Sequence, residues 1–298
     1  MTVKNISIGT TFRWIDGAFA LLRRNPRTIL GACALLLLVI LVPAILQQVV
    51  LLALRPMNSS KELAVMLVFM LVNSVVIPPA LGGLFRLLQA CDRGMQVRAT
   101  FIFDVYHEQG AASRMISIAL ISVVLYAAVL FVANAVIGDG YLVDLVKAVL
   151  SAQPGKPPIL PAAPNGLLLW VVVFTFVLVV MATAYNLAMT QAAMTPRSPL
   201  TCIADGFSAT LRNLAAFLGF YLVMSVVVLV VLLIVALAIG LIAVMLGLAS
   251  KALAFLVVFV IYMGLMLLMY AIVFGVNYLA WRDTLGEGDT EIAQQIAA

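Results

Sequence analysis

The side chains that most often carry chemistry are scarce in this chain, which has one histidine and three cysteines. His107 is followed by Glu108, but a solvated, charged helix face explains that pair better than acid–base catalysis does. The cysteines Cys33, Cys91 and Cys202 are scattered, with no C-x-x-C spacing. The chain also lacks the G-x-S-x-G, H-E-x-x-H and P-loop motifs. We therefore expect no metal, no cofactor and no enzyme activity.

A second group of residues consists of prolines and polar side chains that interrupt long apolar runs. Proline removes a backbone donor, so "IPPALGG" at 77–83 predicts a kinked or broken helix, and the kink is favoured. Polar side chains in a membrane helix usually form interhelical hydrogen bonds, and the sharper alternative is a polar pocket. The candidates for a helix break or a polar pocket are Pro43, Pro78, Pro79, Asn73, Tyr185, Asn186, Gln191 and Asn277.

The positions of these residues depend on how the chain meets a membrane. Hydrophobic residues make up 65% of the sequence, charged residues make up 10%, and the mean hydropathy is +1.20. A soluble domain cannot bury that much apolar surface, so the composition predicts an all-α, polytopic membrane protein. Each span needs about 20 apolar residues. We expect six spans, at 28–54, 63–88, 115–137, 167–189, 214–238 and 252–278.

Basic residues are divided unequally between the two sides of these spans. Twelve of the 17 Lys and Arg residues precede the first span, lie in or beside the second and fourth loops, or follow the sixth span. Because loops rich in Lys and Arg stay on the cytoplasmic side, both termini are expected in the cytoplasm. The net charge of +5 then reflects topology and membrane lipids, and we expect no nucleic-acid partner.

Two similar segments precede the first and fifth spans. "WIDGAFALLRRNP" at 14–26 and "CIADGFSATLRN" at 202–213 both contain Asp-Gly, apolar residues and Arg-Asn. We expect each to form an amphipathic helix in the membrane interface, with Asn25 and Asn213 placed to cap the spans that follow. The expected apolar faces are Phe12, Ile15, Phe19 and Leu22 in the first helix and Ile203, Phe207 and Leu211 in the second.

A third, less similar segment begins at Thr100, which is placed to cap a short helix, and ends at Ser113 and Arg114 before the third span. The chain thus divides into three pseudo-repeated units, about 10–90, 99–194 and 198–282, each an interfacial helix followed by a helical hairpin. They form one membrane domain, 1–282, and the acidic tail at 283–298 is expected to be partly disordered. The candidate lipid-headgroup or partner surface is Arg23, Arg24, Arg114, Arg212, Asp16, Asp104 and Asp205.

Three segments carry a resemblance to known membrane families: "GAFALLRRNP" at 17–26, "IPPALGGLFRLLQACDRG" at 77–94 and "SPLTCIADGFSATLRN" at 198–213. In these the chain resembles uncharacterised bacterial six-span families related to the membrane domain of some glycerophosphoryl diester phosphodiesterases. The resemblance implies the fold and a bacterial inner-membrane location. It implies no activity, because the soluble phosphodiesterase domain has no counterpart in this sequence.

Three functions remain open from the sequence. The first is a non-enzymatic inner-membrane protein with a structural, accessory or lipid-binding role, in contact with lipids and with a protein partner at its cytoplasmic face. The alternative is a transporter or channel for a small or amphipathic substrate, and the third is a membrane-embedded enzyme acting on lipid headgroups. The sequence gives no oligomeric state.

Overall fold

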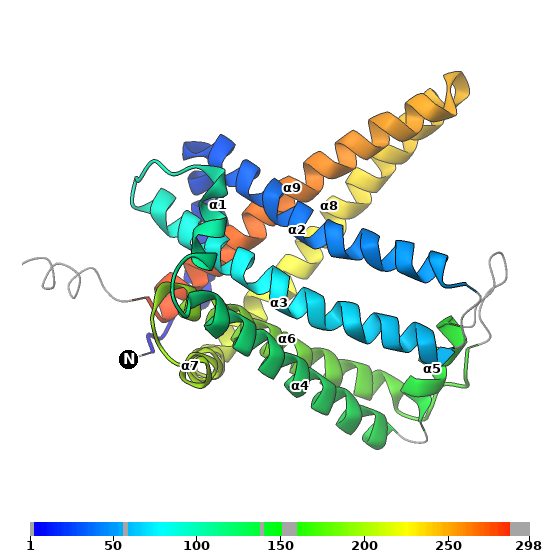
Figure 1. The fold of residues 1–298 in the computed structure, drawn as a ribbon, viewed down its shortest axis with the longest axis horizontal. Helices are drawn as coiled ribbons and strands as arrows, with labels where there is room; N and C mark the ends of the chain where they lie inside the picture. Colours follow the sequence, from blue (N-terminus) through cyan, green and yellow to red (C-terminus); the bar gives the residue numbers. More distant parts are fainter. Residues whose placement is uncertain (1–2, 56–58, 138–139, 151–159, 287–298) are drawn as a thin grey trace, which may run out of the picture.

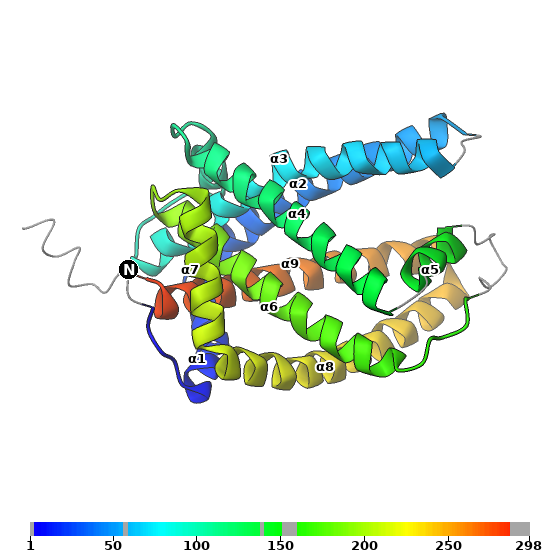
Figure 2. The same ribbon diagram turned by 90° about the horizontal axis from the view of Figure 1, so that it is seen from below.

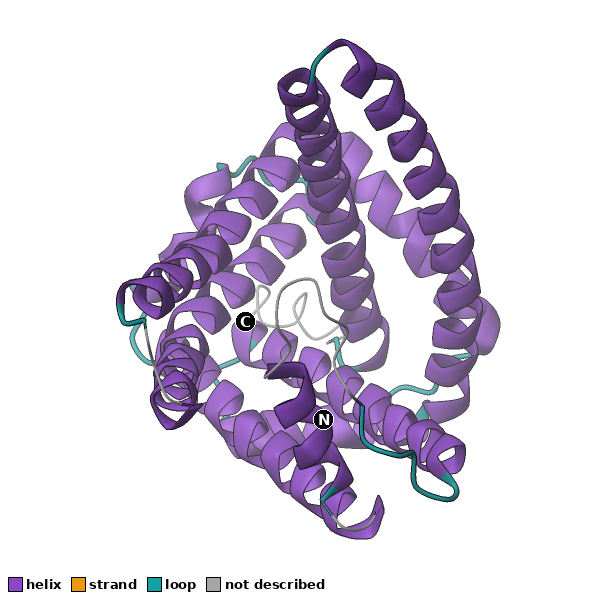
Figure 3. Ribbon diagram, turned by 90° about the vertical axis from the view of Figure 1, so that its right-hand side faces the viewer, coloured by secondary structure: helices purple, strands orange, loops and turns teal. Residues whose placement is uncertain are grey.

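The computed structural model describes residues 3–55, 59–137, 140–150 and 160–286, and helix is the only regular structure in that part of the chain (Figure 1; Figure 3). The acidic tail predicted at 283–298 lies outside the described residues from position 287 onward. The helices are α1 (Ile8–Arg24), α2 (Pro26–Ala53), α3 (Ser59–Asp92), the 3-10 helix η1 (Ala99–Tyr106), α4 (Ala111–Ile137), α5 (Tyr141–Leu150), α6 (Leu167–Met194), α7 (Pro199–Arg212), α8 (Leu214–Ala249) and α9 (Lys251–Thr284).

Six of these helices, α2, α3, α4, α6, α8 and α9, are long and apolar enough to cross a membrane. This confirms the predicted all-α fold with six spans. Helix α8 continues to Ala249, past the predicted end at 238, because one glycine in a long apolar helix costs only about 1 kcal/mol. Only Ser250 separates it from α9. Helix α9 extends through Thr284, so Asp283 belongs to this helix rather than to the predicted tail.

Three of the four short helices, α1, η1 and α7, gather at one end of the molecule, which we call the end that carries the short helices. Figures 1 and 2 show α1, η1 and α7 at the same end as the first and last described residues, with α5 at the opposite end. Each short helix precedes two long helices that run away from this end and return, namely α2 with α3, α4 with α6, and α8 with α9. That element order is the predicted one, and the relation between the three units as repeats stays a prediction.

The buried core lies at the end that carries the short helices. Its largest fully buried side chains are Trp14, Phe85, Ile29, Leu36, Leu84, Leu87, Leu88, Ile102, Met115, Ile118, Leu187 and Met189. Away from this end the long helices expose apolar side chains, and none of the most apolar stretch of α8 is buried inside the protein. Such surfaces are stable only in contact with lipid or with another protein.

The faces that α1 and α7 turn toward the bundle differ from the predicted ones. The predicted face of α1 contributes only Leu22 to the fully buried core. The predicted face of α7 contributes no fully buried residue, although Ile203 is partly buried against the core. A Cβ atom on Gly206 would overlap the carbonyl oxygen of Ala184 in α6, so α7 needs small residues at this contact. The buried residues are Thr11, Trp14, Ala18, Leu21 and Leu22 in α1, and Cys202, Gly206, Ala209 and Thr210 in α7.

The predicted caps are confirmed only in part. Asn25 occupies the N-cap position of α2, with Pro26 in the first helical turn, but its side chain makes no capping hydrogen bond. Thr100 lies inside η1, which begins at Ala99 after Arg98. Ser113 lies inside α4, where its hydroxyl donates to the carbonyl oxygen of Gly110. The third segment therefore forms a compact 3-10 helix rather than a copy of α1.

Helix α3 runs through Pro78 and Pro79 without interruption, so the broken form of this helix is wrong. Just before the proline pair, the Tyr106 hydroxyl of η1 donates to the carbonyl oxygen of Val76, at 2.7 Å, and so joins η1 to α3. Burial raises the pKa of this hydroxyl, although its hydrogen bond to the Ala80 backbone lowers it, and Tyr106 therefore stays a donor.

Candidate functional site

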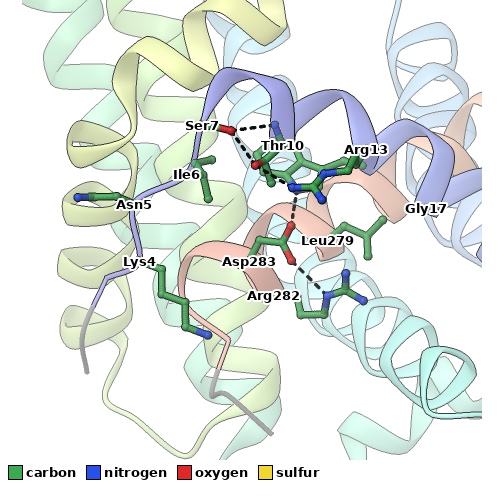
Figure 4. Close-up of a pocket in the computed structure, with 11 residues that line it drawn as sticks. Lys4, Asn5, Ile6, Ser7, Thr10, Arg13, Gly17, Leu279, Arg282 and Asp283 are labelled. Carbon is green, nitrogen blue, oxygen red and sulfur yellow. Dashed lines mark hydrogen bonds and ion pairs between the residues drawn. The ribbon is translucent and has the colours of Figure 1, made fainter.

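A cleft of about 810 Å³ lies between α1, the residues before it and the last turn of α9, and we call it the α1–α9 cleft (Figure 4). It lies at the end of the molecule that carries both described chain ends. Its lining brings together residues from the two extremes of the sequence. The lining residues are Lys4, Asn5, Ile6, Ser7, Thr10, Arg13, Trp14, Gly17, Leu279, Arg282 and Asp283.

The segment before α1 is held in the cleft by Asn213. The Asn213 Oδ1 accepts from the Ile6 N–H at 2.8 Å, and its Nδ2 donates to the carbonyls of Lys4 and Ala209 at 3.0 Å each. The Lys4 N–H also donates to the carbonyl oxygen of Thr284, at 3.0 Å. Asn213 was predicted to cap the fifth span, and instead it joins the end of α7 to the start of the chain.

Trp14 fixes α1 against α8 and α9. Its indole is 2% exposed and lies 5.7 Å from the Phe217 ring and 5.6 Å from the Phe220 ring. Its Nε1 donates to Asp283 Oδ2 at 2.9 Å. Because a buried indole N–H needs an acceptor, this bond sets the position of α1 along α9 and with it one wall of the cleft.

Positive charge exceeds negative charge in the cleft. Asp283 is the one carboxylate of the lining, and it is already bonded to Trp14 and to Arg282. Lys4 Nζ donates to the carbonyl oxygen of Gly286 at 3.0 Å, and Arg13 donates to Thr10 Oγ1 at 3.1 Å. In the described part of the chain neither cation has a carboxylate partner. In Figure 4 the side chains of Arg13 and Arg282 lie near Asp283, whereas that of Lys4 extends away from it.

The residues of the predicted headgroup or partner surface differ in their exposure and pairing. Arg23, Arg24, Arg212, Asp16 and Asp104 are exposed at the end that carries the short helices, and none forms an ion pair within the described residues. Asp205 pairs with Arg197 at 3.1 Å. Arg114 is only 16% exposed and lies 3.7 Å from Glu108. The three predicted aspartates therefore do not play equivalent roles.

Arg86, the charged residue that falls within the predicted spans, has a structural explanation. Its Nε donates to the carbonyl oxygen of Ala193 in α6 at 2.5 Å, and its guanidinium forms a two-pronged ion pair with Glu108. The bond from Arg86, with the charges of Arg86 and Arg114, lowers the pKa of Glu108 although partial burial raises it. Glu108 therefore forms ion pairs with two arginines, Arg86 and Arg114, rather than an acid–base pair with His107.

This lowered pKa predicts a pH dependence of stability. Glu108 stabilises the fold fully above its ordinary pKa of 4.5, and this contribution is lost as the pH falls through the lower pKa of the folded protein. Between pH 5 and the lowest pH at which both proteins stay folded, we expect the unfolding temperature of the E108Q variant to change less than that of the unmodified protein. The exposed, unpaired Asp104 supplies a D104N control that should behave as the unmodified protein does. Identical pH profiles for E108Q and the unmodified protein would contradict the pairing.

A second cavity, of about 450 Å³, lies among α2, α3, α4 and α6, and we call it the polar cavity. It brings together three of the residues predicted for a polar pocket: Asn73, Pro78 and Tyr185. Gln191 lies elsewhere, buried in a hydrogen bond of 2.6 Å from the indole of Trp281 in α9. The remaining candidates, Pro43, Pro79, Asn186 and Asn277, do not line this cavity. The structure therefore brings only three of the eight candidates together, in a cavity among α2, α3, α4 and α6.

Comparison of the chain with protein-family models, curated proteins and solved structures gave no match. The resemblance to the six-span families accordingly stays a prediction.

Several site residues had no sequence signal of their own. Lys4, Arg13 and Arg282 contributed only to the count of basic residues, because nothing in the sequence places the first turn beside the last. Ser122 and Tyr126 of the polar cavity are four residues apart and therefore share one face of α4. That spacing is the signal that would have identified them.

Proposed function

We propose that this protein is a non-enzymatic, multi-pass protein of the bacterial inner membrane that binds the headgroup of an anionic phospholipid in the α1–α9 cleft. The proposal rests on the excess of positive charge in the cleft. Lys4 and Arg13 line the cleft without a carboxylate partner among the described residues. The carboxylate of Asp283 is already bonded to Trp14 and Arg282. A phosphodiester supplies the negative charge that these two cations lack.

The surroundings of the cleft suit a lipid rather than a soluble anion. Ser7 caps α1 at the cleft, and the positive end of this 17-residue helix adds to the attraction for phosphate. Ile8 and Phe12, beside the cleft on α1, are 50% and 36% exposed, and they offer apolar surface to acyl chains. The cleft volume lies within the range of roughly 300–1,000 Å³ that is usual for ligand sites.

The distribution of charge supports an orientation with both termini in the cytoplasm. The first and last described residues occupy the same end of the molecule as α1, η1 and α7, and twelve of the 17 basic residues belong to segments at that end. Under the positive-inside rule this end faces the cytoplasmic leaflet, where anionic headgroups attract Lys and Arg. The α1–α9 cleft then opens at the depth of those headgroups.

The test is a titration of the detergent-solubilised protein with phosphatidylglycerol, followed by native mass spectrometry. Each basic residue at an anionic surface contributes about 1 kcal/mol, so the K4Q/R13Q variant should bind about 25-fold more weakly. The matched control is R23Q/R24Q, which removes two exposed arginines from the same helix outside the cleft. Phosphatidylcholine, which has no net charge, should bind all three proteins equally.

Two results would contradict the proposal. If R23Q/R24Q weakens phosphatidylglycerol binding as much as K4Q/R13Q does, the exposed surface predicted from the sequence holds the lipid. If K4Q/R13Q keeps its preference for phosphatidylglycerol over phosphatidylcholine, the cleft does not recognise the phosphate charge. Unfolding temperatures of both variants establish that a loss of binding is not a loss of fold.

A further inference from the structure

The polar cavity differs from the α1–α9 cleft in depth and in charge. Asn73 lies 14 residues from the start of α3 and 19 residues from its end, so the cavity lies well away from both ends of this span. None of its lining residues is charged. Because a charge without a partner is costly among membrane spans, an occupant of this cavity has a neutral polar group. The polar lining residues are Gln47, Asn73, Ser74, Ser122, Tyr126 and Tyr185.

Several of these polar groups have no partner in the described part of the chain. The Oδ1 of Asn73 is buried without a hydrogen-bond donor. The hydroxyls of Tyr126 and Tyr185 form no hydrogen bond with any described residue, whereas Ser74 donates to the carbonyl oxygen of Met70 at 2.8 Å. The cavity lining thus combines Asn73, whose buried amide oxygen lacks a donor, with two hydroxyls that can donate or accept.

We propose that the polar cavity binds a neutral lipid with a free hydroxyl in its polar group, of the diacylglycerol class. The lipid hydroxyl donates to the Asn73 amide oxygen after rotation of this amide about its soft terminal torsion, and the ester carbonyls accept from Tyr126 and Tyr185. Met70 lines the cavity and is 40% exposed, so the acyl chains leave the cavity along the apolar surface of α3. A quinone, which offers acceptors only, leaves Asn73 Oδ1 without a donor.

This site is independent of the α1–α9 cleft, and its test uses an uncharged probe. The full-length protein in nanodiscs is labelled with a photoactivatable diacylglycerol, in competition with either unlabelled dioleoylglycerol or its methyl ether, which lacks the free hydroxyl. We expect labelled peptides from α3, α4 and α6, and competition about five-fold weaker with the ether than with the alcohol. The Asn73→Leu variant should lose this preference for the alcohol.

A second pair of variants separates binding from folding. Y126F/Y185F removes the two hydroxyls and keeps both rings, and labelling should fall at least about five-fold. Y262F/Y270F removes two hydroxyls from α9, which does not line the cavity, and should label as the unmodified protein does. Equal competition by alcohol and ether, or labelling as strong on the lipid-exposed α8 as on α3, would overturn the proposal. Unchanged labelling of Y126F/Y185F would also overturn it.

Discussion

Replacing Gly83 with alanine should destabilise this protein by about 3 kcal/mol, the upper end of what overpacking costs. A Cβ atom at this position would overlap the carbonyl oxygen of Ile102 and lie 2.7 Å from its Cα, so the clash is with backbone and no rotamer change relieves it. To avoid it, η1 must move away from α3. Ile102 and Val105, at most 1% exposed, would then lose their burial, and Tyr106 would lose its bond to Val76.

The neighbouring glycine supplies the control. A Cβ atom on Gly82 would meet the sulfur and methyl group of Met115, the far end of a flexible side chain that can turn away. The G82A variant should therefore cost roughly 1 kcal/mol or less, and Gly240, which has open space around it, should tolerate alanine fully. Urea titration of the micelle-bound protein measures all three. Equal stability of G83A and G82A would show that η1 does not rest on α3 at this glycine.

The six spans and their order could be predicted from the sequence because each apolar run is bounded by charges or helix-breaking residues. A bilayer accepts few alternatives to a continuous helix over such a run. The limits of α8 and α9 were predicted less well. Helix α8 continues because neither Gly240 nor Gly247 ends a helix in an apolar environment. Asp283 is retained in α9 by its bond to Trp14.

The orientation of the short helices could not be predicted by the logic of a soluble protein, which places large apolar residues inside. At a membrane surface these residues have a second apolar neighbour, the lipid, and helices instead approach one another through small residues. Gly206 packs against α6 while Leu211 is 57% exposed, and Ala18 packs against Gly275 while Phe12 is exposed. The apolar face of a helix in the sequence was therefore a poor guide to its protein contacts.

The candidate sites were predicted only where their residues came from spans already recognised. Asn73, Pro78 and Tyr185 stood out because a proline or polar side chain is unusual in an apolar run. Lys4 and Arg282 are ordinary surface residues in the sequence, and they meet only because the N-terminal segment crosses between α7 and α9. The two Arg-Asn pairs looked equivalent, and only the fold distinguishes Asn25 from Asn213.

This difference between the two asparagines gives the second large effect. The N213A variant should lose about 2–3 kcal/mol, because its buried amide makes hydrogen bonds to Ile6, Lys4 and Ala209 that no other described side chain replaces. The N25A variant should lose less than about 0.5 kcal/mol, since the Asn25 side chain makes no capping bond. Unfolding of both variants in the same detergent measures the difference.

A local measurement separates this account from a general loss of stability. Without the Asn213 amide, the segment before α1 is released, and trypsin should cleave after Lys4 far faster in N213A than in N25A under conditions where both remain folded. N213D should be cleaved as readily as N213A, because its carboxylate faces the carbonyl oxygens of Lys4 and Ala209 without a hydrogen to donate. Slow cleavage of N213A would mean that the bonds from Lys4 to Thr284 and Gly286 retain the segment without Asn213. Rapid cleavage together with weaker phosphatidylglycerol binding would link the position of Lys4, set by Asn213, to recognition in the α1–α9 cleft.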